Sequence, residues 1–179
     1  KINSVGFLVD PDQAMIWRGP MASQALTQLL TQSRWGTAED PLDVLVVDLP
    51  PGTGDVQLTL TQKTLIDGAV VVSTPQEMAL ADARRAVTLF GKTAIPVLGV
   101  VENMAYLATP DGGEMEIFGR GGAKQMADAL KVPFLGEVPL DPAMRKGCDE
   151  GRPVTALEPD SQLASRFKVM AERILKALK

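Results

Sequence analysis

Cysteine is almost missing from this 179-residue sequence, since Cys148 is its single representative. One cysteine cannot form a disulfide within the chain, so a disulfide framework is excluded and a reducing, cytoplasmic setting is expected. Aromatic residues are also scarce, at 4% of the chain. The core is therefore expected to consist of Val, Leu, Ile, Ala and Met side chains.

Long apolar runs and basic character are lacking as well. No stretch approaches the about 20 apolar residues that span a bilayer, and the first residues, KINSVGFLVD, lack the layout of a signal peptide. They resemble the middle of a longer chain. The formal net charge of −4 argues against a nucleic-acid-binding protein, whose surface would be basic. The length suits one domain, or most of one.

A phosphate-binding loop is also absent from the sequence. The only approach to one is Gly91-Lys92-Thr93, and the first glycine of that motif is replaced by Ala86. The motif also requires a strand before it and a helix after it, so that the helix amino end faces the phosphates. Here a predicted helix precedes the triplet and a strand follows it, which indicates an ordinary helix end.

Apolar runs of strand length alternate with amphipathic segments along the chain. This order predicts right-handed βαβ units and an α/β fold with a three-layer, mostly parallel sheet. Near-continuous apolar runs are typical of strands buried on both faces. The predicted strands are 4–9, 43–48, 69–73, 96–103 and 133–138, and the predicted helices are 19–33, 56–66, 77–90, 123–130, 142–150 and 161–178. Between them, the glycine-rich segment 104–122 has Met115, Ile117 and Phe118 as its only apolar anchors.

The segment VLVVDLPPGTGD, residues 44–55, is the strongest indication of function. Asp48 ends an apolar run, and a carboxylate there is costly unless it is paired or bound to a cation. In nucleotide hydrolases an acid at this place holds Mg²⁺. Pro50 and Pro51 fix the backbone, and Gly52 permits close approach to a phosphate. Asp55 stands at the expected start of a helix, where an N-cap role explains it and is compatible with catalysis.

Two further candidates lie where predicted strands end. Ligands of parallel sheets bind beyond the carboxyl ends of the strands, and Asn103 and Pro139 follow two of these ends. An asparagine amide offers a donor and an acceptor, which can recognise the edge of a purine. From these residues alone, an ordinary turn is the better explanation of both positions.

The last predicted helix carries an apolar stripe flanked by basic residues. Such a helix can lie on an anionic membrane. Packing of the stripe against the sheet is the commoner arrangement and the one we expect.

Taken together, these motifs resemble the Mrp/ApbC family of iron–sulfur cluster carriers, relatives of MinD among the P-loop ATPases. The resemblance extends over essentially the whole chain. It rests on VGFLVD, WRGPM, VVDLPPGTGDVQLTL, TPQEMALADARRA, PVLGVVENM, IFGRGGA, VPFLGEVPLDPAMR and GRPV.

The resemblance implies a homodimer that binds ATP between its subunits and delivers a cluster to recipient proteins. It implies that Asp48 lies beside Mg²⁺, that residues 50–52 sense the phosphate, and that Asn103 and Pro139 contact the base. Family members carry a phosphate loop in an amino-terminal region, which also supplies the central strand of the sheet. This sequence has neither, so it resembles a fragment, and the resemblance implies that residues 1–179 are the carboxy-terminal part of a single nucleotide-binding α/β domain. We expect negligible ATP hydrolysis by this polypeptide alone.

A second departure concerns the cluster. Family members carry Cys-x-x-Cys after the ENM segment, so that two subunits supply four thiolates. The corresponding residues here are Thr109, Pro110, Asp111 and Gly112, and we do not expect this chain to hold a cluster. Two alternatives remain open: a MinD-like positioning ATPase that reaches membranes through its final helix, and a non-catalytic scaffold.

Overall fold

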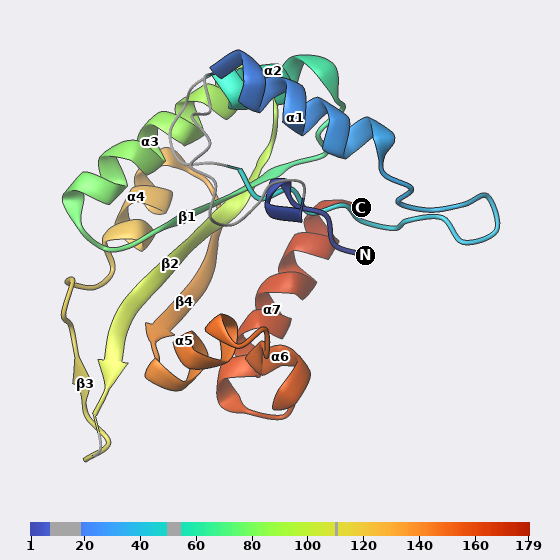
Figure 1. Cartoon of the computed structure of the whole chain (residues 1–179). Helices are drawn as coiled ribbons and strands as arrows, with labels where there is room; N and C mark the ends of the chain where they lie inside the picture. Colours follow the sequence, from blue (N-terminus) through green and yellow to red (C-terminus); the bar gives the residue numbers. More distant parts are fainter. Residues whose placement is uncertain (8–18, 50–54, 110) are drawn as a thin grey trace. The chain divides into compact units, whose positions relative to one another are not determined.

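The computed structural model describes residues 1–7, 19–49, 55–109 and 111–179 (Figure 1). The chain divides into two compact units, Lys1–Ile66 and Asp67–Lys179, and each is described by itself. The expectation that both belong to one nucleotide-binding domain stays a prediction.

The first unit is built on two packed helices, α1 (Gly19–Gln32) and α2 (Asp55–Lys63). Ala25 and Leu60 are buried, and the Thr59 hydroxyl donates to Ser23 Oγ at 3.1 Å. The amino-terminal element is a single 3₁₀ turn, η1 (Val5–Phe7), rather than the strand predicted over 4–9.

The strand predicted over 43–48 is not formed, and this prediction was wrong for the structure described. Residues 44–49 have no regular secondary structure, and Val46 is 86% exposed. A strand is stable only beside a hydrogen-bonded neighbour, and among the described residues this segment has none. An apolar sequence alone therefore does not make it a strand.

The second unit contains a mostly parallel sheet. Strands β1 (Ala69–Ser73) and β4 (Phe134–Leu140) both pair in parallel with the central β2 (Val97–Ala108), and the two-residue β3 (Glu114–Met115) pairs with β2 in antiparallel fashion. The helices of this unit are α3 (Glu77–Lys92), α4 (Gly122–Leu130), α5 (Pro142–Asp149), α6 (Val154–Leu157) and α7 (Gln162–Ala177).

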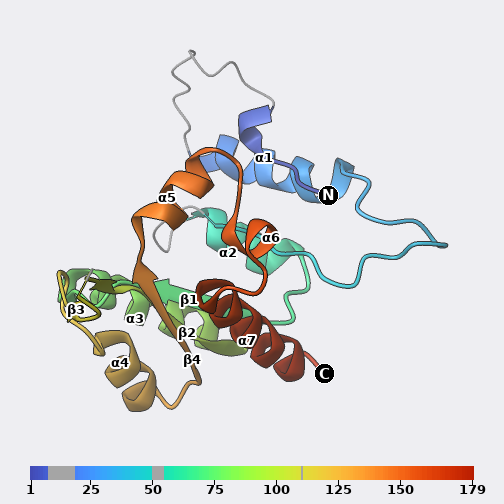
Figure 2. The same ribbon diagram turned by 90° about the horizontal axis from the view of Figure 1, so that it is seen from below.

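Helices cover both faces of this sheet, which gives the three layers predicted. Helices α3 and α4 pack on one face, and α7 packs on the other, against β4 and β2 (Figures 1 and 2). Val101, Leu135, Val138 and Met170 form a buried apolar cluster beneath α7. The α/β fold class is thereby confirmed. Within the apolar stripe of α7, Met170 is buried against the sheet, and Phe167 and Ile174 pack partly buried against the same cluster, as expected. Leu175 remains 48% exposed.

Within the described residues, none of the helices combines the length and the apolar character needed to traverse a bilayer. The Gly91-Lys92-Thr93 triplet lies where α3 ends, with Thr93 as the C-cap residue. This placement confirms that the triplet is a helix end.

Candidate functional site

Asn103 lies where β2 changes its path. From Val101 to Asn103 β2 pairs regularly with β4, where Asn103 is opposite Val138, and the register then shifts before Leu107 meets Leu140. Met104 has a left-handed φ of 55°, and its N–H donates to Asn103 Oδ1 at 3.0 Å. The Asn103 side-chain nitrogen makes no hydrogen bond to any residue that the structure describes. Its donor capacity remains available for a ligand.

Pro139 lies on the neighbouring strand, one residue beyond the partner of Asn103. It is half-buried. The chain then turns into α5, where the Asp141 carboxylate caps the helix by accepting the Met144 N–H at 2.7 Å. The structure thus brings Asn103 and Pro139 together on adjacent parallel strands. Pro139 lies near the carboxyl end of β4, where ligands of such sheets bind. The prediction that the other strand ends at Asn103 was wrong, because β2 continues to Ala108; Asn103 instead lies directly after the last residue of β2 that pairs with β1.

The remaining predicted site residues belong to the other unit. Asp48 is described and exposed, in a segment without regular structure. Pro50, Pro51 and Gly52 lie outside the described residues. Asp55 is the first residue of α2, so a helix does begin where the sequence predicted. Asp48 and Asn103 therefore belong to different compact units of the chain.

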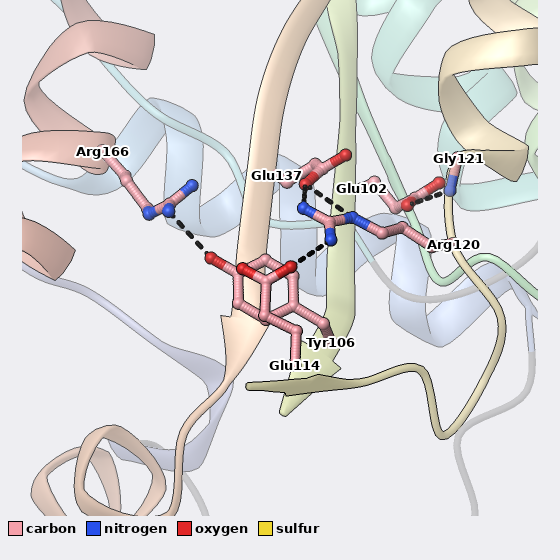
Figure 3. A network of polar contacts seen from close by, with 7 residues as sticks. All are labelled: Glu102, Tyr106, Glu114, Arg120, Gly121, Glu137 and Arg166. Atoms are coloured by element: carbon pink, nitrogen blue, oxygen red, sulfur yellow. Dashed lines mark hydrogen bonds and ion pairs between the residues drawn. The ribbon is translucent and has the colours of Figure 1, made fainter. Parts of the chain in front are cut away.

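A fully buried carboxylate, which the sequence analysis missed, lies directly before Asn103. Glu102 has no exposed surface, and its two oxygens accept the N–H groups of Gly121 and Ala123, each at 2.7 Å (Figure 3). These amides form the amino end of α4, where a negative charge is stabilised. The hydrogen bonds satisfy a charge whose burial would otherwise be very costly. The sequence did contain a signal for this group, because Glu102 is an acid inside the otherwise mostly apolar run VLGVVENM, residues 97–104.

Arg120 is the second group that the sequence analysis missed. Its Nη2 and Nε donate to Glu137 Oε2 at 2.8 and 3.2 Å, its Nη1 pairs with Glu114, and its guanidinium lies 4.4 Å from the centre of the Tyr106 ring (Figure 3). The hydrogen bonds to Glu137, and then those to Glu114, raise the pKa of Arg120 above its ordinary value. The Tyr106 hydroxyl accepts from Arg166 Nη2 at 2.8 Å. The segment between β2 and α4 is therefore held by charged groups.

This polar network corrects the expectation that apolar residues anchor segment 104–122. Met115 is 54% exposed and Ile117 is 47% exposed, while Phe118 is only half-buried. Two-residue strands bury little surface, so apolar contacts there are few. The buried Glu102 and the ion pairs of Arg120 supply the missing attachment.

The tip of the β2–β3 hairpin is a closed turn. The Thr109 and Gly113 backbones are joined by a 2.9 Å hydrogen bond, and the Gly112 N–H donates to the Thr109 carbonyl at 3.0 Å. Hydrogen bonds from the Thr109 hydroxyl and then the Gly113 N–H lower the pKa of Asp111. Among the residues that the structure describes, no cluster of three or more Cys, Asp or Glu side chains is placed to hold a metal ion.

With this geometry in view, comparison with known proteins decides the family. A family model described as a NUBPL iron-transfer P-loop NTPase, of the ParA type, matches residues 1–175. The chain belongs to this family. It is also 49% identical, over 99% of its length, to the iron-sulfur cluster transfer protein NUBPL of Dictyostelium discoideum. The chain spans about half of that relative, 54% of its length.

Solved structures agree on the fold. A nucleotide-binding protein from Archaeoglobus fulgidus in complex with ADP is 38% identical, with a TM-score of 0.65, over 80% of this chain and 56% of that one. The cell division ATPase MinD of Pyrococcus furiosus is 24% identical, with a TM-score of 0.60, over 89% of this chain and 59% of that one. At that identity the likeness to MinD shows a shared fold alone. The resemblance to the iron–sulfur carrier family is confirmed by the family match.

Proposed function

We propose that this chain supplies the base-contacting and Mg²⁺-binding parts of the ATP site in an iron–sulfur cluster transfer ATPase. The observation that carries the proposal is the pairing of Asn103, directly after the part of β2 that pairs with β1, with the end of β4 that bears Pro139. The similar Archaeoglobus protein was solved with ADP, which supports a nucleotide as the ligand of this fold. The reaction belongs to the whole protein.

In this proposal Asn103 and Pro139 recognise the base. The Asn103 amide nitrogen is an available donor and can bind a ring nitrogen of a purine. Pro139 presents a rigid apolar ring from the adjacent strand and can pack against the base. The hydrogen bond from Met104 to Asn103 Oδ1 fixes the orientation of the amide before the nucleotide arrives, which lowers the cost of ordering it on binding.

Asp48 is the proposed Mg²⁺-side acid. Its carboxylate is exposed and forms no hydrogen bond or ion pair with the described residues, so its oxygens suit a hard cation. Bound Mg²⁺ would neutralise charge on the β- and γ-phosphates. Pro50, Pro51 and Gly52 are proposed to form the segment that senses the γ-phosphate, with Asp55 opening the helix behind it.

The experiment uses the protein extended upstream by the segment that its relatives possess. We expect Asp48→Asn to lower the ATPase kcat at least about 10-fold, because positioned charge stabilisation of that order acts at the transferred phosphate. Asp43→Asn, which changes an exposed acid of the same unit, is the matched control and should leave the rate unchanged. Equal rates for Asp48→Asn and the parent would remove Asp48 from the mechanism.

The cluster is the cargo of the proposed reaction. Because the sequence has one cysteine and the hairpin tip is closed by Thr109 and Asp111, we propose that this chain does not itself ligate the cluster. Cluster transfer to recipient proteins, a homodimer with ATP between its subunits, and a cytoplasmic location are likewise proposed for the whole protein. The family description and the name of the Dictyostelium relative support cluster transfer.

A further inference from the structure

The β2–β3 hairpin, residues 107–115, has little to hold it through its own backbone. Among the described residues, two pairs join its strands, Leu107 with Met115 and Ala108 with Glu114, and the Thr109–Gly113 hydrogen bond closes its tip. The β2 arm is held in the sheet by the pairing of Leu107 with Leu140, whereas both residues of β3 are exposed. A two-stranded ribbon is at best marginally stable in water without further packing. The attachment of β3 should therefore depend on contacts outside the hairpin backbone.

Arg120 supplies such contacts from a different segment of the chain. Its guanidinium joins Glu114 on the hairpin to Glu137 on β4, and it lies over the ring of Tyr106 at the base of the hairpin. Tyr106 is 5% exposed, so its ring forms a fixed floor for the guanidinium. The side chain of Arg120 is 30% exposed, so solvent screens its ion pairs less than those of a fully exposed side chain.

The position of Arg120 is determined in turn by Glu102. The buried carboxylate holds the N–H of Gly121, the next residue along the chain, and that of Ala123. Glu102 and Glu137 face each other across β2 and β4, so adjacent carboxylates of the sheet hold the backbone and the side chain of the same loop. On the far side of this loop, a Cβ on Gly122 would lie 2.6 Å from the Pro75 carbonyl oxygen. The loop is thus closely fitted between the sheet and α3.

We propose that Arg120 is the positioning residue of the β2–β3 hairpin. In this proposal Glu102 fixes the place of Arg120, because its carboxylate on β2 holds the N–H groups of Gly121 and Ala123. The group Glu102, Glu114, Arg120 and Glu137 is a latch: it holds the hairpin when closed and frees it when Arg120 leaves the two carboxylates. Because Glu102 directly precedes Asn103, the latch and the candidate base site share one stretch of β2. The proposal goes beyond the proposed function and does not depend on a nucleotide.

The latch predicts local exchange behaviour that general destabilisation would not produce. Amide hydrogen exchange of the complete chain is measured by NMR at residues 107–109 and 111–115, with Val101 and Val138 as reporters of the central sheet. In Arg120→Gln we expect hairpin exchange to rise at least about 10-fold while the reporters keep their rates. Arg120→Lys, which retains a charge without the planar fork, should give a smaller rise. Arg84→Gln removes an ion pair with Glu77 on α3 and should leave the hairpin unaffected.

Glu102→Gln is the decisive variant, because Glu102 does not contact the hairpin. It should also accelerate hairpin exchange, and faster exchange of the sheet reporters in this variant would show that it perturbs the sheet instead. In that case Glu137→Gln, which removes a partner of Arg120 on β4, replaces it and must raise hairpin exchange with the reporters unchanged. Hairpin rates within about twofold of wild type in Arg120→Gln, or equal acceleration of hairpin and reporters in every variant, would overturn the proposal.

Discussion

At the scale of single residues, replacing two different glycines by alanine should change the free energy of unfolding in opposite directions. A Cβ on Gly122 would lie 2.6 Å from the Pro75 carbonyl oxygen and 2.7 Å from Leu80 Cδ1, whereas one on Gly91 would meet nothing within 4 Å. Gly122→Ala should therefore lower the free energy of unfolding by about 1–3 kcal/mol, since a backbone carbonyl cannot yield cheaply. Gly91→Ala should raise it by up to about 0.5 kcal/mol, because Gly91 lies in the last turn of α3, where the cost of a glycine is smaller than in mid-helix.

Chemical denaturation followed by circular dichroism measures both changes. The Gly91 variant also bears on the Gly91-Lys92-Thr93 triplet, since a phosphate loop would require that glycine. Destabilisation by Gly91→Ala, or neutrality of Gly122→Ala, would contradict the packing described for α3 and α4.

At the scale of elements, the attachment of α7 can be tested by cavity formation. Met170 is 7% exposed in the cluster with Val101, Leu135 and Val138, whereas Val169 is 41% exposed on the same helix. Met170→Ala should cost about 2–5 kcal/mol of unfolding free energy, and Val169→Ala should cost less than about 1 kcal/mol. Both values come from the same denaturation measurement. Similar costs for the two variants would mean that α7 does not pack through this face.

The elements also show what the sequence could predict. The runs that became β1, β2 and β4 were identified because most of their residues are apolar. Burial on both faces was wrong for β1, since Val70 and Val72 are exposed. Segment 43–48 is similarly apolar but has no neighbouring strand among the described residues, which its composition could not reveal. Asn103 and Pro139 were singled out because both predicted strands were expected to end there, although β2 continues beyond Asn103 to Ala108. Glu102 and Arg120 were missed because their partners, Gly121 and Glu137, come together only through the crossover and the strand register.

At the scale of the whole molecule, apolar surface on the sheet predicts self-association. Among the described residues β1 pairs with β2 alone, and Val72 on β1 is 59% exposed. An unpaired strand edge with exposed apolar side chains favours association with other chains. We expect light scattering to show concentration-dependent association, and Val72→Lys to reduce it. Val169→Lys, which charges an exposed position on α7, is the control. A monodisperse monomer at all concentrations would contradict this expectation.

The central claim is that Asn103 recognises the base of a bound nucleotide, and ADP affinity tests it most directly. Isothermal titration calorimetry is performed on the protein extended upstream, as parent, Asn103→Ala, and the control Gln125→Ala at an exposed position of α4. We predict at least about 10-fold weaker ADP binding by Asn103→Ala, since the loss of a hydrogen bond to a buried ligand edge costs about 1–3 kcal/mol. Gln125→Ala should bind as the parent does. Equal affinities for the parent and Asn103→Ala would contradict the account.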